Sequence, residues 1–233
     1  MRRLATYAIA PDSTDRAYFA QVFGWMAAAL AVTGGVAAAV GHDQRALHAI
    51  FRTSGFPYVF VGLLLIQLLL VGGLVRLVQH MDVFTAGAIF LGYAALSGLT
   101  ISVIFAVYTT KSIFATFLVA AGMFAALAVA GYATDLDLTS WGAFLGMALF
   151  GQIVGLVVNL FWLNDTLYWV TTVVGIVLFS AYTAYDVQKL KQYETEGGDP
   201  ATVEKEAIVG ALALYLDFVN LFLYLLRLFG RRR

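Results

Sequence analysis

The chain has 233 residues, of which 61% are hydrophobic and 12% are charged, and its 14 basic and 14 acidic side chains balance to a net charge of zero. A soluble domain carries about 25% charged residues because its surface must be largely polar, so this composition excludes an ordinary soluble protein. The absence of cysteine excludes disulfides and thiolate metal sites, and the zero net charge gives no reason to expect a nucleic-acid partner.

Apolar residues come in blocks that are long enough to cross a bilayer. About 20 helical residues, rising about 1.5 Å each, cover the roughly 30 Å of hydrocarbon. Seven blocks predict seven transmembrane helices, at about 19–40, 57–79, 83–107, 112–132, 141–163, 167–190 and 206–229. All three prolines lie outside these spans or at the start of one. The predicted fold class is therefore an all-α integral membrane bundle of seven transmembrane helices.

The segments outside the spans are short, since no joint exceeds about 16 residues, and this favours a single domain. We predict a cytoplasmic N-terminal tail at 1–18, a seven-helix transmembrane domain at 19–230 and a basic C-terminal tail at 231–233. The N-terminal tail has no long apolar run that ends in a small-residue cleavage site. The first span is therefore predicted to be a retained signal anchor.

Lysines and arginines near the span ends predict the orientation, because they favour the cytoplasmic side. With the N-terminus in the cytoplasm, the tail and the even-numbered joints hold seven basic residues, and the opposite joints hold three. This bias favours an N-terminus inside. Four more arginines, Arg227, Arg231, Arg232 and Arg233, would then lie outside if all seven segments cross the membrane. Either the bias is overridden at this tail, or the last segment is re-entrant.

Ionisable residues inside a span are costly and therefore point to function. Asp217 lies in the middle of the seventh span, and Asp186 lies in the sixth. If these spans form an antiparallel hairpin joined around 194–206, Asp186 lies about 12 Å and Asp217 about 16 Å from the joint, so the two carboxylates can meet. A helix that carries a carboxylate in mid-segment is expected to be shielded from lipid by the other six helices.

Further polar residues lie on the same helical faces as the two aspartates. Asn220 and Tyr224 follow Asp217 by three and seven residues, and Tyr182 precedes Asp186 by four. Two carboxylates at low dielectric cannot both ionise cheaply, so they tend to share one proton. We expect the pair to act as a pH sensor and, when ionised, as a hard oxygen site for transient Ca²⁺ binding.

The same charged residues also allow a structural interpretation. Asp186 can lie at the interface, neutralised by Lys189 and Lys191, and Arg76, near the end of the second span, can extend to the lipid headgroups. In that interpretation Asp186 has no role in sensing or transport.

Motifs of several enzyme classes are missing from the sequence. It has no HExxH motif, no phosphate-binding glycine loop and no GxSxG nucleophile elbow. Intramembrane aspartyl proteases carry a glycine immediately before one aspartate, where this chain has Tyr185 and Leu216. We therefore expect neither an enzyme nor a resident cofactor.

Three stretches resemble the transmembrane Bax-inhibitor-motif family in its bacterial branch. They are GYAALSGLTISVIFAVYT (92–109), FSAYTAYDVQKLKQ (179–192) and ALALYLDFVNLFLYLLRLFG (211–230), and their order and spacing match. The resemblance implies a bundle of six helices around a central seventh helix, in the cytoplasmic (inner) membrane of a bacterium. It also implies a pH-sensitive calcium leak channel, closed by a hydrogen-bonded pair at Asp186 and Asp217. The family adds a basic residue from the second span, for which Arg76 is the candidate.

The leading hypothesis is thus a pH-gated leak pathway for a cation, in particular Ca²⁺, with Asp186 and Asp217 as gate and sensor. The resemblance leaves one alternative open, a non-transporting membrane regulator of a membrane-bound protease or of a stress response. The expected partners are the lipid bilayer, Ca²⁺ or H⁺ and, in the alternative, that membrane protease.

Overall fold

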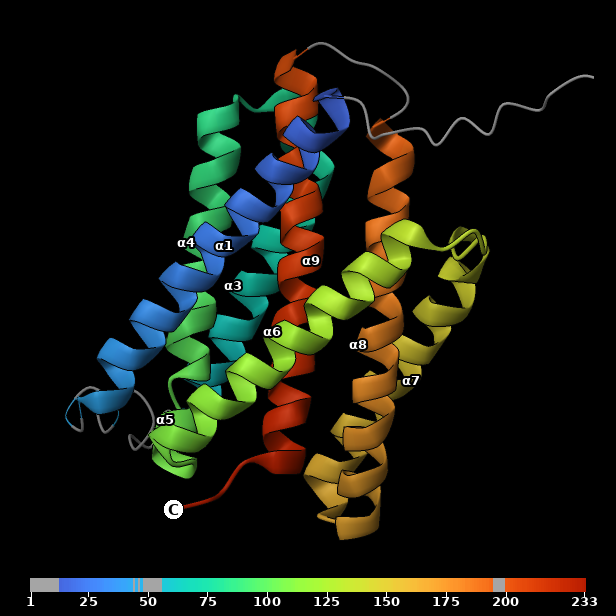
Figure 1. The fold of residues 1–233 in the computed structure, drawn as a ribbon. Helices are drawn as coiled ribbons and strands as arrows, with labels where there is room; N and C mark the ends of the chain where they lie inside the picture. Colours follow the sequence, from blue (N-terminus) through green and yellow to red (C-terminus); the bar gives the residue numbers. More distant parts are fainter. Residues whose placement is uncertain (1–12, 44, 46, 48–55, 195–199) are drawn as a thin grey trace, which may run out of the picture.

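The fold is known from a computed structural model, which describes residues 13–43, 45, 47, 56–194 and 200–233 (Figure 1). Seven helices in this part of the chain are long and apolar enough to cross a membrane, which confirms the predicted fold class. They are α1 (Ser13–His42), α3 (Phe56–Leu77), α4 (Val83–Ile101), α6 (Thr110–Ala133), α7 (Gly142–Trp162), α8 (Asp165–Glu194) and α9 (Pro200–Phe229).

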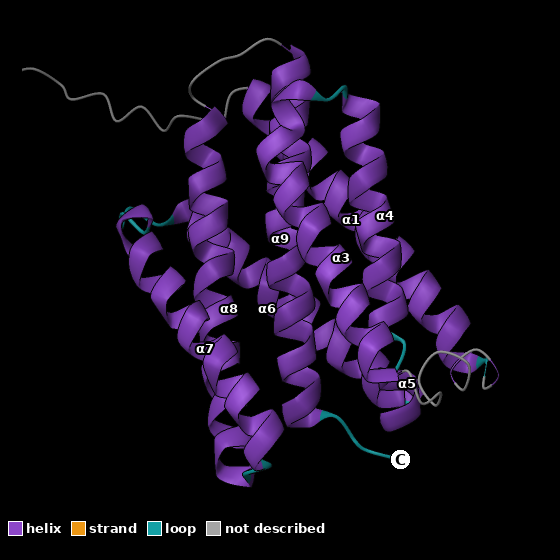
Figure 2. Ribbon diagram, turned by 180° about the vertical axis from the view of Figure 1, so that it is seen from behind, coloured by secondary structure: helices purple, strands orange, loops and turns teal. Residues whose placement is uncertain are grey.

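Three short helices lie in or beside the joints: η1 (Val78–His80) continues α3, α5 (Ile104–Val107) follows α4, and η2 (Thr139–Trp141) leads into α7. Of the predicted tail 1–18, residues 1–12 lie outside the described part of the chain, and α1 already begins within the remainder. Figure 2 shows how short the described connections between the helices are.

Polar side chains set several of the helix starts at the joints. The Thr85 backbone N–H and hydroxyl donate to the two carboxylate oxygens of Asp82, at 3.0 and 2.7 Å, and so cap α4. These hydrogen bonds hold the pKa of the exposed Asp82 carboxyl below its ordinary value. Thr109 caps α6 in the same way, by accepting from the Ser112 backbone N–H at 3.3 Å.

Helix α9 lies at the centre of the bundle, between α1, α4, α6 and α8 (Figure 1). In its most apolar 18-residue stretch 67% of the residues are buried, against 11% in the corresponding stretches of α3 and α7. Those two helices lie at the periphery, α3 mainly against α4 and α7 mainly against α8. The predicted central position of the last helix is therefore confirmed.

The last helix crosses the whole bundle. It begins at the end where α1 begins, and the C-terminus lies at the opposite end (Figures 1 and 2). Past the helix the chain is held in place, because the Thr109 N–H donates to the Arg231 carbonyl at 3.1 Å and the Arg233 N–H to the Val107 carbonyl at 3.0 Å. The re-entrant alternative is thus wrong for this structure.

This path of α9 changes the charge argument for orientation. The four C-terminal arginines join the three basic residues predicted for that side, which makes the numbers on the two sides equal. Lysine and arginine counts therefore no longer favour either orientation, and the cytoplasmic position of the N-terminus stays a prediction.

Close helix contacts around α8 depend on two glycines. A Cβ atom at Gly131 of α6 would clash with the backbone of Ala184 in α8, and one at Gly210 of α9 would lie 2.5 Å from a methyl group of Leu190. By contrast, nothing lies within 4 Å of a Cβ atom placed at Gly122, on the same helix as Gly131. Gly131 thus lets α6 and α8 approach backbone to backbone.

Because seven helices span the bundle, tags at the two ends of the chain should lie on opposite sides of the membrane. Protease accessibility of an N-terminal and a C-terminal tag, in intact cells and in inverted vesicles, measures this directly. Cleavage of both tags from the same side would contradict the seven-span topology.

Gly131→Ala should destabilise the protein by about 1–3 kcal/mol, because the added methyl group meets backbone atoms that cannot move aside. Gly122→Ala is the matched control on the same helix and should be neutral or slightly stabilising. Thermal unfolding in detergent compares the two variants with the wild type. Equal melting temperatures for both would contradict the close α6–α8 contact.

Candidate functional site

Two carboxyl groups meet between α8 and α9. The side chains of Asp186 and Asp217 come within hydrogen-bonding reach of each other. Asp217 is only 4% exposed, whereas Asp186 is half-buried. A carboxylate can only accept a hydrogen bond, so this contact requires a proton on one of the two groups. The structure therefore brings together the two aspartates that the hairpin argument had placed at similar depth.

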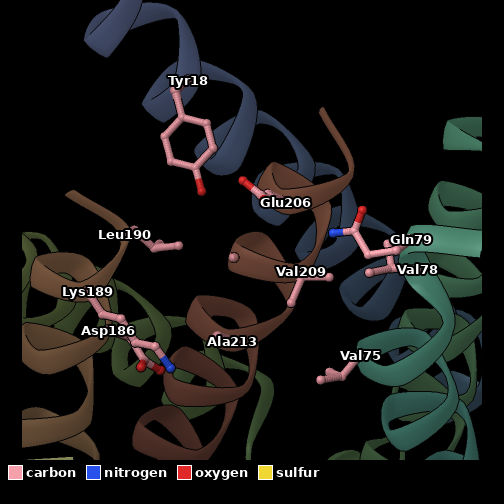
Figure 3. Close-up of a pocket in the computed structure, with 11 residues that line it drawn as sticks. Tyr18, Val75, Val78, Gln79, Asp186, Lys189, Leu190, Glu206, Val209 and Ala213 are labelled. Carbon is pink, nitrogen blue, oxygen red and sulfur yellow. The ribbon is translucent and has the colours of Figure 1, made fainter. Parts of the chain in front are cut away.

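A first cavity, of about 300 Å³, reaches the pair from the N-terminal side of the bundle (Figure 3). Its walls come from α1, α3, α8 and α9, and most of the side chains that line it are apolar. The charged side chains on its lining are Asp186, Lys189 and Glu206. Glu206 lies near the start of α9, two helical turns before Ala213, and so marks the end of the cavity that is remote from the pair.

A second cavity, of about 410 Å³, extends from the pair towards the C-terminal end of α9. It lies between α7, α8 and α9, and both aspartates line it. Asp186 and Ala213 line the first cavity as well as the second. Asp186 thus lies on the lining of both cavities, and Asp217 lies beside it on the lining of the second.

The predicted polar stripe lines the second cavity. Tyr182, Asn220 and Tyr224 are all among its lining residues. The Tyr224 hydroxyl accepts a hydrogen bond from Nε2 of Gln152 at 2.9 Å, and Gln152 also donates to the Thr171 carbonyl at 2.6 Å. These bonds connect α7, α8 and α9 beyond the aspartates.

Arg76 does not reach the pair in this structure. It is exposed on α3 and lines neither cavity, and no hydrogen bond or ion pair joins it to Asp186 or Asp217 among the described residues. The cation that acts electrostatically on Asp186 is Lys189, one turn further along α8. The spacing of three residues between Lys189 and Asp186 already predicts their proximity from the sequence. The role of Gln152 is not predictable in this way, because its hydrogen-bond partners lie on two other helices.

The pair offers few ligands to a metal ion. No group of three or more His, Cys, Asp or Glu side chains is placed to hold a metal in the described part of the chain. Ca²⁺ prefers six to eight oxygen ligands, so two carboxylates suit a transient contact with a hydrated cation better than a resident ion. One oxygen of Asp217, Oδ2, is buried without a protein hydrogen-bond partner among the described residues.

The opposite face of α9 carries a separate polar network. The hydroxyls of Tyr215 and Thr33 lie 2.7 Å apart, and the Thr33 hydroxyl donates to the Ala94 carbonyl of α4 at 2.9 Å. Ser97 donates to Gln67 at 3.2 Å, and Gln67 donates to Thr100 at 2.7 Å. This buried network joins α9 to α1, α3 and α4 on the side away from the aspartates.

Comparison with known proteins agrees with this architecture. The family described as "Inhibitor of apoptosis-promoting Bax1" matches residues 15–233. The inner membrane protein YbhL of Escherichia coli K12 is 42% identical over 228 residues, which are 97% of this chain and 96% of YbhL. An uncharacterized protein of Borreliella burgdorferi is 40% identical over 93% of this chain and 92% of its own length. Protein RP147 of Rickettsia prowazekii is 38% identical, with 95% and 92% covered.

Tyr224→Phe should lower the free energy of unfolding by about 1 kcal/mol, because it removes one buried hydrogen bond from Gln152. Gln152→Leu should cost about 1–3 kcal/mol, because it leaves the Tyr224 hydroxyl and the Thr171 carbonyl without their donor. A double-mutant cycle by thermal unfolding should show that the two effects are not additive. Strict additivity would contradict the Gln152–Tyr224 contact.

Proposed function

Because this chain belongs to the Bax inhibitor family and is a multi-pass protein of the inner membrane, we propose that it is a pH-sensitive leak pathway for cations, in particular Ca²⁺. The pathway runs through the two cavities, and the pair formed by Asp186 and Asp217 is its gate. The proposal needs neither an enzymatic step nor a resident cofactor.

The observation that carries the proposal is the position of the pair at the junction of the two cavities. A carboxyl pair that shares a proton holds α8 against α9. It carries one negative charge instead of two and therefore attracts a permeating cation only weakly. If water fills the two cavities, the barrier to a cation is confined to the region of the pair. The protonated arrangement therefore corresponds to the closed state of the pathway.

Loss of the shared proton opens the pathway. Two ionised carboxylates repel each other at low dielectric, and they attract a cation into the junction. The charged and titratable groups on the linings of the two cavities are Lys189 and Tyr182 on α8 and, further from the pair, Tyr18 on α1 and Glu206 and Tyr224 on α9. Since α7 packs mainly on α8, a shift of α8 against α9 would carry α7 with it. Flux should consequently rise as the pH rises.

Calcium flux into proteoliposomes between about pH 5 and 8, where carboxyl groups at low dielectric are expected to titrate, tests this proposal. The wild type should leak more at higher pH. Asp217→Asn and Asp186→Asn should lose this dependence, because an amide donates a hydrogen bond to the remaining carboxylate at every pH. Asp82→Asn is the matched control: it removes an exposed carboxylate at a joint and keeps a good helix cap, so its pH profile should equal that of the wild type.

Unchanged pH dependence in both pair variants would contradict the sensor role of the aspartates. A folded wild type that transports no cation at any pH would contradict the leak pathway altogether. It would favour the alternative of a membrane regulator, for which a pull-down of a membrane-bound protease, lost on deletion of residues 1–18, is the corresponding test.

A further inference from the structure

Lys189 stands beside the aspartate pair inside the first cavity. It lies one helical turn from Asp186, towards the end of the bundle where α1 begins. Both side chains lie on the α8 wall of the cavity (Figure 3). Its Nζ atom is 5.9 Å from the centre of the Tyr185 ring, and it interacts electrostatically with the Asp186 carboxyl. A cation that approaches Asp186 through this cavity therefore comes near the ammonium group.

The other described basic residues at this end have different surroundings. Lys191 donates to the Tyr132 carbonyl at 3.0 Å and lies 4.6 Å from the centre of the Tyr132 ring, so α6 holds it. Lys205 donates to the Gln79 carbonyl at 3.3 Å. Arg76 is exposed on α3. Among these four side chains, only Lys189 lines the cavity that leads to the pair.

We propose that the Lys189 ammonium is a resident counter-ion of Asp186 that competes with the permeating cation for this carboxylate. The inference rests on the proposed leak function. In it, Lys189 sets the affinity of Asp186 for a cation that enters through the first cavity. A tethered ammonium cannot leave, so it stays beside Asp186 whether or not an external cation is bound. A divalent ion displaces it more readily than a monovalent ion, since its charge is double.

The size of the effect follows from Coulomb's law. Residues three apart on a helix have Cβ atoms about 5–6 Å apart. At this separation the Lys189 charge should change the affinity of Asp186 for a cation by about three- to tenfold. The effect is smaller than in a dry interior, because Lys189 is only half-buried and water screens its charge.

Flux measurements with matched lysine variants test the proposal. Lys189→Gln and Lys189→Met should lower the Ca²⁺ concentration for half-maximal flux by about three- to tenfold. Lys189→Arg keeps the charge and should resemble the wild type. Lys191→Gln removes a lysine two residues further along the same helix, outside the cavity, and should also resemble the wild type. Thermal unfolding first checks that Lys189→Gln and Lys189→Met are folded. If the folded variants need the same Ca²⁺ concentration for half-maximal flux as the wild type, the counter-ion role is wrong.

A second measurement does not depend on transport. A hydrophobic carbodiimide modifies carboxyl groups in membrane spans, and mass spectrometry locates the modified peptide. Ca²⁺ should protect Asp186 from modification, and Lys189→Gln should lower the half-protecting concentration by the same factor as above. A shift in protection without any flux by the wild type would overturn the leak function but support the counter-ion role. Flux by the wild type with no shift in either assay would overturn only the counter-ion role.

Discussion

The cost of a carboxyl group in the middle of a membrane-spanning helix is the constraint on which the rest of this structure depends. Asp217 cannot face lipid, so α9 must lie inside the bundle, where the other helices bury it. Inside the bundle the carboxyl still needs a polar partner, and Asp186 provides one through a bond that requires a proton. The central helix, the pair and the sensitivity of their contact to protonation thus follow from one residue.

The two faces of α9 have different chemistry, and this divides the bundle. Tyr215 faces the network with Thr33 and Ser97, whose hydrogen bonds involve neutral groups and do not change with pH over the physiological range. Asp217 lies on the opposite face, because two residues turn a helix by about 200°. One half of the bundle, with α1, α3 and α4, is therefore fixed to α9 at any pH. The other half, α7 with α8, is joined to it by the Gln152–Tyr224 hydrogen bond and by the contact between the two aspartates, and only the aspartate contact involves a proton that can be lost near neutral pH.

Much of this arrangement is predictable from the sequence, because its causes are local. Length and apolarity locate the seven helices, and the distances of Asp186 and Asp217 from their joint place the two side chains at the same depth. The contributions of Arg76, Lys189 and Gln152 depend instead on how each helix is rotated and tilted, which packing across the bundle decides. A contact such as that of Gly131 with α8 leaves no trace in local periodicity. The side of the C-terminus likewise depends on whether α9 crosses completely, which composition alone does not determine.

A pathway that conducts must bind its ion strongly enough to admit it and weakly enough to release it. Two carboxylates, with no third acidic ligand beside them in the described part of the chain, meet this condition, since they replace only part of the hydration shell of Ca²⁺. In the proposed mechanism the Lys189 ammonium weakens the site further by competing for the Asp186 oxygen atoms. Both features would be faults in a protein that stores calcium. In the proposed leak pathway they would keep the pair unoccupied for most of the time, so that its protons rather than its bound ions would determine whether α8 and α9 stay together.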